Sequence, residues 1–153
     1  MYLGYVSPRP EMPRAARIVY PGVPHHITQR GNRRQHVFFS DEDKLLYLRL
    51  LSKWAAKAGL KIWAYCLMNN HVHHVAVPEA EDSLAVTFGE THKAYTRLIN
   101  ERQDWRGFLW QGRFTSFPMD VPYLYRAVRY DELNPVRAKI VQDAVDYQWS
   151  SAR

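Results

Sequence analysis

Apolar and polar residues alternate along some stretches of the chain and recur at helical spacing along others. The alternation over residues 25–30 predicts a strand that ends at Gly31. Ser40 is followed by three acidic residues, the composition of a helix start, because a hydroxyl caps the free N–H groups and acids favour the positive end of the helix dipole. Leucines then recur at helical spacing as far as Ala58, and Gly59 is expected to end this helix.

The next two segments predict a β-hairpin. Residues 61–67 and 71–77 have strand character, and Asn69-Asn70 supplies a tight turn between them. Further along, we predict a helix over about residues 83–102, a strand over 113–119, a helix over about 122–133 and a short helix that begins at Asn134 and Pro135. This order of elements predicts an α+β fold with one antiparallel sheet and its helices packed on one face.

Length and composition indicate one globular domain. The chain has 153 residues, of which 46% are hydrophobic and 24% are charged. We expect a flexible basic segment over residues 1–17 and a single domain over residues 18–153. The apolar runs fall far short of the roughly 20 residues that cross a bilayer, and the N-terminal region has Pro and Arg where a signal peptide is apolar. A single cysteine, Cys66, excludes an internal disulfide and a Cys-based zinc finger, so we expect a cytoplasmic protein.

Charge points to a polyanionic partner. Lys and Arg number 21 against 15 Asp and Glu, which gives a formal net charge of +6. Arginines outnumber lysines by 15 to 6. This bias favours phosphate recognition, because a guanidinium group can bind phosphate through two parallel hydrogen bonds and can also stack on bases.

The sharpest local motif is Asn70-His71-Val72-His73-His74-Val75. Side chains alternate along a strand, so His71 and His73 share one face and His74 lies on the other. Two imidazoles at that spacing can hold one divalent metal ion, each through one ring nitrogen. The alternative is a pair of surface histidines beside a turn.

A second motif lies near the predicted end of the helix over residues 122–133. On a helix Arg126, Tyr130 and Asn134 fall at i, i+4 and i+8 on one polar stripe, and Arg137 lies near its continuation. Such a stripe can place a phenol, a phosphate-binding cation and an amide ligand side by side. The alternatives are that Tyr130 is a core residue and that Asn134 only caps the helix beginning at Pro135.

Several segments resemble one known family in order along the chain. They are PGVPHHITQRGNRRQHVFF, NNHVHHVAVP, FLWQGRFTS, RYDELNPVRAKIV and YQWSSAR, and the resemblance covers residues 17–153. The family is that of the REP-associated tyrosine transposases, which belong to the HUH single-tyrosine endonucleases and are related to small insertion-sequence transposases. This sequence departs from the usual pattern at Asn69, where the family has Pro, at His74, where it has an aliphatic residue, and at Lys139, where Gly is frequent.

The resemblance implies a specific chemistry. His71 and His73 correspond to the histidines that bind a catalytic divalent metal, Mg²⁺ or Mn²⁺, and Asn134 corresponds to a third, polar ligand. Tyr130 corresponds to the nucleophile that attacks single-stranded DNA and forms a 5′-phosphotyrosine intermediate. The family's fold is a small α+β domain of ferredoxin or RNA-recognition type, in agreement with the predicted elements. The expected activity is DNA cleavage and strand transfer near hairpins, in transposition or in mobilisation of repeated extragenic palindromes.

The resemblance also implies a bacterial protein that associates with the nucleoid when bound to DNA, as a monomer or a homodimer without a membrane partner. Interleaved arginines and aromatic residues suit single-stranded or hairpin DNA, whose exposed bases stack and whose phosphates pair with cations. The aromatic residues concerned are Phe38, Trp105, Phe108 and Trp110. The candidate DNA-binding residues are Arg30, Arg33, Arg34, Arg106, Arg113, Arg126, Arg129 and Arg137.

Two other functions fit parts of the pattern. A non-enzymatic nucleic-acid-binding module needs exposed aromatic residues on the central strands and no metal. A metal-dependent hydrolase would use water, the two histidines and a carboxylate such as Asp131 or Glu132, and would form no protein–DNA adduct.

Overall fold

The computed structural model of the chain describes residues 17–153, so the expected basic segment over residues 1–17 lies outside the described part except for Arg17. Every predicted helix and strand is present, with ends that differ from expectation by a few residues at most. In chain order the elements are β1 His25–Arg30, the 3₁₀ turn η1 Asn32–Arg34, α1 Asp41–Ala58, β2 Leu60–Met68, β3 His71–Pro78, α2 Ser83–Gln103, β4 Thr115–Pro118, α3 Val121–Glu132, α4 Asn134–Arg137 and the 3₁₀ turn η2 Ala144–Asp146. None of the helices among residues 17–153 is long and apolar enough to cross a membrane.

The four strands form one antiparallel sheet in the order β2-β3-β1-β4. The β2–β3 hairpin turns at Asn69 and Asn70, as expected, and β1 lies on the other side of β3. His73 therefore stands between Cys66 on β2 and Thr28 on β1. Strand β3, which carries the three histidines of the hairpin motif, is held by backbone hydrogen bonds on both sides, a rigid position for a functional group.

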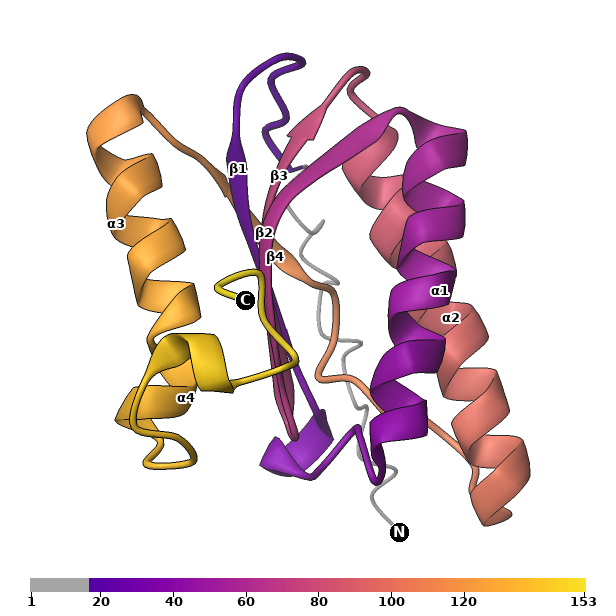
Figure 1. Ribbon diagram of the computed structural model, residues 1–153. Helices are drawn as coiled ribbons and strands as arrows, with labels where there is room; N and C mark the ends of the chain where they lie inside the picture. The colour runs from indigo at the N-terminus through magenta and orange to yellow at the C-terminus, as the bar shows by residue number, and fades with distance from the viewer. Residues whose placement is uncertain (1–16) are drawn as a thin grey trace, which may run out of the picture.

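The helices cover both faces of the sheet, so the expectation that they pack on one face is wrong for α3 and α4. Figure 1 shows the sheet almost edge-on, with α1 and α2 on one side and α3 and α4 on the other. Helix α3 packs on β2 and β3 through Leu124, Ala127 and Val128, which meet Ala64 and Val75. The physical reason is in β3, which is buried at seven consecutive residues from Val72 to Pro78 and therefore needs cover on both faces.

The main core lies between the sheet and helices α1 and α2, and it encloses His74. The His74 side chain is fully buried, and its Nε2 lies 3.4 Å from the hydroxyl of Tyr47. That hydroxyl also lies 3.0 Å from Nε2 of His92. Burial lowers the pKa of His74 to about 3, so the ring stays neutral. As strand alternation predicts, His74 points away from His71 and His73.

An ion pair between a buried carboxylate and a half-exposed guanidinium joins the start of α1 to the end of α2. Both carboxylate oxygens of Asp43 accept hydrogen bonds from the Arg102 guanidinium, at 2.6 and 3.0 Å. Asp43 is 1% exposed, and it also accepts a hydrogen bond from the Phe39 backbone N–H at 2.8 Å. Burial alone would raise the pKa of Asp43, but these hydrogen bonds outweigh it and hold the pKa below its ordinary value.

Replacing Arg102 with methionine is expected to lower the free energy of unfolding by about 2 kcal/mol at pH 7. Loss of one partner of a buried pair costs roughly 3–5 kcal/mol, and the lower figure reflects the half-exposed Arg102 side chain. Because the folded-state pKa of Asp43 is depressed, the pair stabilises the protein above the unfolded-state pKa, and this stabilisation is lost as pH falls through the folded-state value. The difference in the free energy of unfolding between the wild-type and Arg102→Met proteins should therefore shrink below about pH 4.

Urea unfolding followed by tryptophan fluorescence at pH 7 and at pH 3 measures both effects. Arg97→Met is the matched control, because Arg97 lies on α2, is exposed and has no carboxylate partner within residues 17–153. Equal destabilisation by the two substitutions would show that the Asp43–Arg102 pair contributes nothing of its own.

Candidate active site

His71 and His73 project from the first residues of β3 toward the face covered by α3. Their ring centroids lie 5.0 Å apart. His71 is partly exposed, whereas His73 is 8% exposed. The shared face that strand alternation predicts for the two residues is confirmed.

Each of the two rings has its Nδ1 atom beside an oxygen. Nδ1 of His71 lies 2.6 Å from Oδ1 of Asn70, and Nδ1 of His73 lies 3.0 Å from Oδ1 of Asp131. An oxygen acceptor at Nδ1 favours the tautomer with its proton there, which leaves the lone pair on Nε2. Burial lowers the pKa of His71 to about 4, so that ring is neutral at pH 7.

Tyr130 on α3 and Asn134 on α4 lie beside the histidines, on the face of the sheet that these two helices cover. The Tyr130 ring lies on the last turn of α3, its centroid 6.0 Å from that of His73, and its side chain is 52% exposed. The amide nitrogen of Asn134 lies 3.1 Å from Nε2 of His73. Tyr130 is therefore not a core residue. The capping alternative for Asn134 also fails, because α4 begins at Asn134 itself, after Leu133, and has no side-chain cap.

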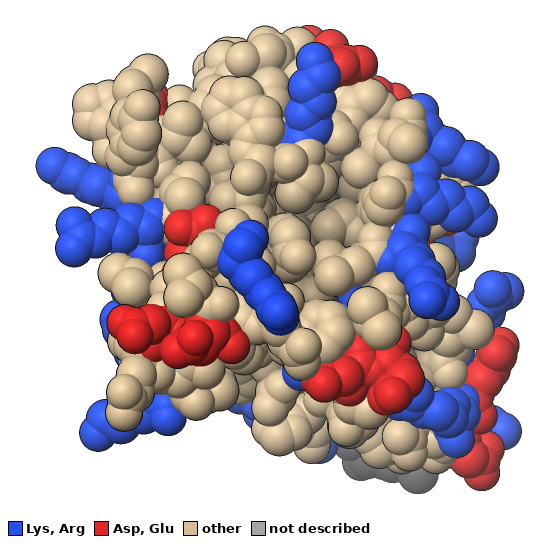
Figure 2. Space-filling model, in the orientation of Figure 1, with Lys and Arg blue, Asp and Glu red and all other residues tan. Residues whose placement is uncertain are grey.

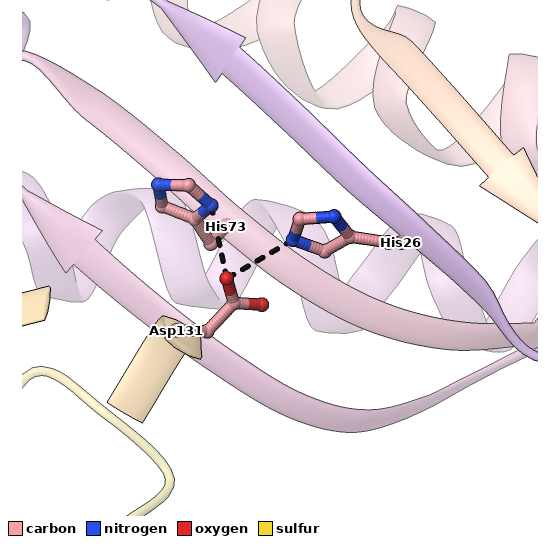
Figure 3. A group of neighbouring side chains, drawn as sticks. All are labelled: His26, His73 and Asp131. Atoms are coloured by element: carbon pink, nitrogen blue, oxygen red, sulfur yellow. Dashed lines mark hydrogen bonds and ion pairs between the residues drawn. The ribbon is translucent and has the colours of Figure 1, made fainter. Parts of the chain in front are cut away.

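Asp131 forms the floor of the site. Figure 3 shows its carboxylate between two imidazoles, with Nε2 of His26 and Nδ1 of His73 each 3.0 Å from the same oxygen, Oδ1. Asp131 is fully buried. Burial alone would raise its pKa, but the contacts with His26 and His73 outweigh burial and hold the pKa below its ordinary value.

His26 was not among the site residues predicted from the sequence. Its strand, β1, is the neighbour of β3, and alternation within His25–Arg30 places every second residue on the face of His73. That signal is usable only when the strand order is known. Asp131 was named only as the carboxylate of a hydrolase.

Two overlapping sets of atoms fit a divalent metal ion. The first is Nε2 of His71, Nε2 of His73 and the side-chain amide of Asn134, whose oxygen can replace its nitrogen by a flip of the amide. The second is His26, His73 and Asp131, whose ligand atoms all lie within 4.8 Å of one another. Imidazole and amide or carboxylate oxygens are ligands that divalent ions accept in proteins. In the second set, however, Oδ1 is already hydrogen-bonded to Nε2 of His26 and lies 3.0 Å from Nδ1 of His73, so the carboxylate faces both rings directly.

The predicted DNA-binding arginines fall into separate places. Arg137 packs on the catalytic candidate itself, with its guanidinium carbon 3.9 Å from the centroid of the Tyr130 ring and a hydrogen bond to the Tyr130 carbonyl. Arg30 pairs with His71 in the sheet register, and Arg126 precedes Tyr130 by one turn of α3. Arg129 lines a groove together with Trp63.

The remaining arginines lie farther along the molecule. Arg33 and Arg106 line one hollow beside η1, Arg34 is exposed in the same turn, and Arg113 lines a different hollow beside α2. On the face seen in Figure 2, basic side chains project at both flanks and acidic ones gather in groups between them, so this face has no single basic patch.

Two of the four aromatic residues named as candidates for base stacking are exposed, and two are buried. Phe108 is 88% exposed, and Trp105 is about half exposed. Phe38 and Trp110 are buried in the main core, where they pack against each other at a centroid distance of 6.5 Å. Sequence position alone did not separate the two pairs.

The geometry weighs against both alternative functions. The central strands β1 and β3 carry no Phe, Trp or Tyr, whereas a binding module of the RNA-recognition type stacks bases on aromatics there. For the hydrolase, Glu132 accepts a hydrogen bond from Ser151 at 3.1 Å, and Asp131 is turned to the Nδ1 side of His73, away from His71.

Comparison with known proteins agrees with this arrangement. Residues 20–132 match the profile of a family described as "Transposase IS200 like". No curated protein sequence matches the chain. A solved REP-associated tyrosine transposase bound to a REP hairpin has a TM-score of 0.76 at 21% identity, over 92% of this chain and 82% of its own. A protein of Deinococcus radiodurans described as a transposase has a TM-score of 0.54 at 19% identity, over 78% and 95% of the two chains.

Proposed function

Because the chain belongs to the family of IS200-like transposases, we propose that it is a metal-dependent single-stranded DNA endonuclease and strand transferase in which Tyr130 is the nucleophile. The observation that carries the proposal is the convergence of Tyr130 and Asn134 on His71 and His73, two rings that have an oxygen beside Nδ1 and so carry their lone pairs on Nε2, where the Asn134 amide meets His73. The site thus combines a nucleophile with ligands that could orient a phosphate beside it.

The chemical step balances without an added co-reactant. The Tyr130 hydroxyl oxygen attacks the phosphorus of a phosphodiester, and the bond from that phosphorus to the 3′-oxygen breaks. The phenolic proton goes to solvent, the 3′-oxygen takes up a proton, and the 5′-phosphate remains attached to Tyr130. Attack by a DNA 3′-hydroxyl on this phosphotyrosine reverses the step and joins strands, so the phosphodiester energy is conserved.

His71, His73 and Asn134 would hold the divalent metal, Mg²⁺ or Mn²⁺. Bound there, the ion would supply positive charge that polarises the scissile phosphate. Asp131 and His26 fix the plane and the tautomer of the His73 ring, the role that second-layer carboxylates have at many metal sites. His26 is thus a positioning residue rather than a ligand.

Cationic side chains near Tyr130 complete the site. Arg137 holds the Tyr130 ring by stacking on its face, and its charge, with that of Arg126, stabilises the negative charge that develops on the phosphate. Arg30, Arg33, Arg34, Arg106, Arg113 and Arg129 are assigned to contacts with the rest of the DNA. The structural neighbour described as bound to a REP hairpin supports a hairpin as the substrate.

End-labelled DNA tests the proposal. A single-stranded hairpin oligonucleotide taken from the flanks of the gene is incubated with the protein and Mn²⁺ and resolved on a denaturing gel. A 5′-phosphotyrosine link predicts that the 3′-labelled oligonucleotide shifts to a slow-migrating adduct. The 5′-labelled one gives a shortened strand with an extendable 3′-hydroxyl.

Three results would overturn it. A shift of the 5′ label means a link to the 3′ side, and cleavage without any adduct means a hydrolase that uses water. Binding without cleavage, with affinity that falls as salt rises, means a binding module.

A further inference from the structure

Residues 147–151 return to the sheet and lie along the outer edge of β2. The Leu67 N–H donates to the Trp149 carbonyl at 2.9 Å, and the Ser151 N–H donates to the Tyr65 carbonyl at 3.0 Å. Figure 1 shows this end of the chain, in yellow, beside the sheet on the side of α3 and α4. We call residues 147–151 the edge segment, because they pair backbone groups that the edge of a sheet otherwise leaves open.

The edge segment lies in the same row of the sheet as the candidate metal ligand His73. Ser150 forms a bridge with Cys66 on β2, and Cys66 pairs with His73 on β3. Tyr147 and Trp149 are buried in the main core, and the Tyr147 hydroxyl donates to a carbonyl of β2 at 2.7 Å. The edge segment is therefore held by its own core contacts and can support a neighbouring element.

The Ser151 side chain joins the edge segment to the end of α3. Its Oγ accepts a hydrogen bond from the Tyr65 N–H at 3.0 Å and lies 3.1 Å from Oε1 of Glu132, the last residue of α3. Oγ also lies 3.3 Å from the Tyr65 carbonyl oxygen, but that oxygen already accepts the Ser151 N–H. Because a carboxylate is the stronger acceptor, the single hydroxyl proton goes to Glu132. Ser151 thus links β2 to the helix that carries Tyr130.

The last turn of α3 is held from two directions. Tyr130 lies beside the His73 ring, and the Asp131 carboxylate lies 3.0 Å from Nδ1 of the same ring. The next residue, Glu132, is bound by Ser151. Successive residues of a helix point about 100° apart, so Asp131 and Glu132 attach this turn to different parts of the sheet. Together these two contacts restrict rotation of the turn about the axis of α3.

Such a rotation would move the Tyr130 hydroxyl. The Tyr130 side chain is 52% exposed, so its direction depends largely on the backbone of the turn from which it projects. Catalytic groups have to lie within about 0.5 Å and 10–20° of the productive geometry. A misplacement of about 1 Å can lower a rate by roughly a hundredfold. A contact that fixes this turn therefore affects the rate without touching the reacting atoms.

We infer that Ser151 is a positioning residue for Tyr130, because its hydrogen bond to Glu132 fixes the turn from which the nucleophile attacks. This inference rests on the proposed function and deepens it, since it extends the active site to the edge segment. Ser151 acts through Glu132 and does not meet the scissile phosphate, so it is not a catalytic residue.

Removal of the hydroxyl tests the inference. In Ser151→Ala, the single-turnover rate of adduct formation at saturating Mn²⁺ and hairpin DNA is expected to fall about tenfold, equal to about 1.4 kcal/mol of activation free energy. Affinity for the hairpin, measured in the cleavage-blocked Tyr130→Phe background, should be unchanged. Ser151→Thr keeps a hydroxyl and should restore the rate. Ser150→Ala is the matched control, because the Ser150 hydroxyl bonds to the Tyr147 carbonyl and not to α3.

A double-mutant cycle shows whether Ser151 acts through Glu132. Glu132→Leu removes the acceptor and should slow adduct formation as much as Ser151→Ala does. The protein with both substitutions should be no slower than either single variant, because the same contact is lost in all three. Effects that multiply, or a wild-type rate in Ser151→Ala, would overturn the inference.

A measurement without DNA separates this inference from the proposed function. Amide hydrogen exchange of the last turn of α3 is followed by mass spectrometry in the full-length wild-type, Ser151→Ala and Ser150→Ala proteins. We expect faster exchange in Ser151→Ala and a wild-type rate in Ser150→Ala. Equal exchange in all three proteins would contradict the inference even where the wild type forms its adduct. Absence of the adduct from the wild type would overturn the proposed function alone, and the exchange rates would still decide whether Ser151 holds the turn.

Discussion

Tyr130→Phe is expected to lower the rate of covalent adduct formation with hairpin DNA by more than about a thousandfold, because the nucleophilic oxygen is removed. The substitution leaves the aromatic ring in place. The packing of the Arg137 guanidinium on that ring and its approach to His73 therefore remain, and the fold should be unchanged. The adduct is measured by denaturing gel under single-turnover conditions with Mn²⁺ in excess.

Tyr125→Phe is the matched control. Tyr125 lies on the same helix, α3, and is 73% exposed, so its hydroxyl is as available to solvent as that of Tyr130 but is not beside the histidines. This variant should form the adduct at the wild-type rate. Adduct formation by Tyr130→Phe at the wild-type rate would assign the nucleophile to another residue.

Local sequence signals accounted for the secondary structure because each boundary depends on residues near it in the chain. Gly59 ends α1 with φ of +64°, and Asp120 caps α3 by accepting a hydrogen bond from the Tyr123 N–H at 2.8 Å. The position of His71 and His73 on one face follows from strand alternation alone. The residues of the site that were predicted correctly to lie together are those for which a repeat of two or four residues decides the geometry.

Contacts between segments far apart in the chain were not predictable in the same way. His26 and Asp131 are separated by 105 positions. They meet only because β1 pairs with β3 and because α3 packs on the face of the sheet where the sequence analysis expected no helix. Arg137, by contrast, is only seven residues from Tyr130, and helical spacing predicted that it lies near the same stripe; only the packing of its guanidinium on the ring depends on the turn between α3 and α4. Such contacts require the tertiary arrangement, which no local pattern contains.

The fate of the aromatic residues illustrates the same limit. Phe38 and Phe39 are neighbours, yet the first is 2% exposed and the second 42%. Likewise Phe108 and Trp110 are two positions apart, and one is exposed while the other is in the core. The interleaving of aromatic residues with arginines predicted a binding surface, but the backbone of the loop after α2 decides that Phe108 is exposed and Trp110 is buried.

Asp131→Asn is expected to weaken Mn²⁺ binding by about 10–100-fold, the usual effect of removing a second-layer partner of a histidine ligand. An asparagine oxygen at the place of Oδ1 can still face both rings, but it lacks the negative charge of the carboxylate that attracts the two ring N–H groups. The plane and tautomer of the His73 ring are then held less firmly. Isothermal titration with Mn²⁺ measures the affinity directly, and adduct formation should recover at saturating Mn²⁺.

Asp143→Asn removes the same charge from an exposed position and should leave Mn²⁺ affinity unchanged.

His26→Ala distinguishes the two possible sets of metal ligands, one with His71 and Asn134 and the other with His26 and Asp131. If His71, His73 and Asn134 hold the ion, His26→Ala lowers affinity modestly, because His26 touches only the carboxylate of Asp131. If His26, His73 and Asp131 hold it, both His26→Ala and Asp131→Asn abolish Mn²⁺ binding, and saturating Mn²⁺ restores neither. That outcome would move the metal to the far side of the His73 ring, away from Asn134, and would leave His71 without a metal to bind.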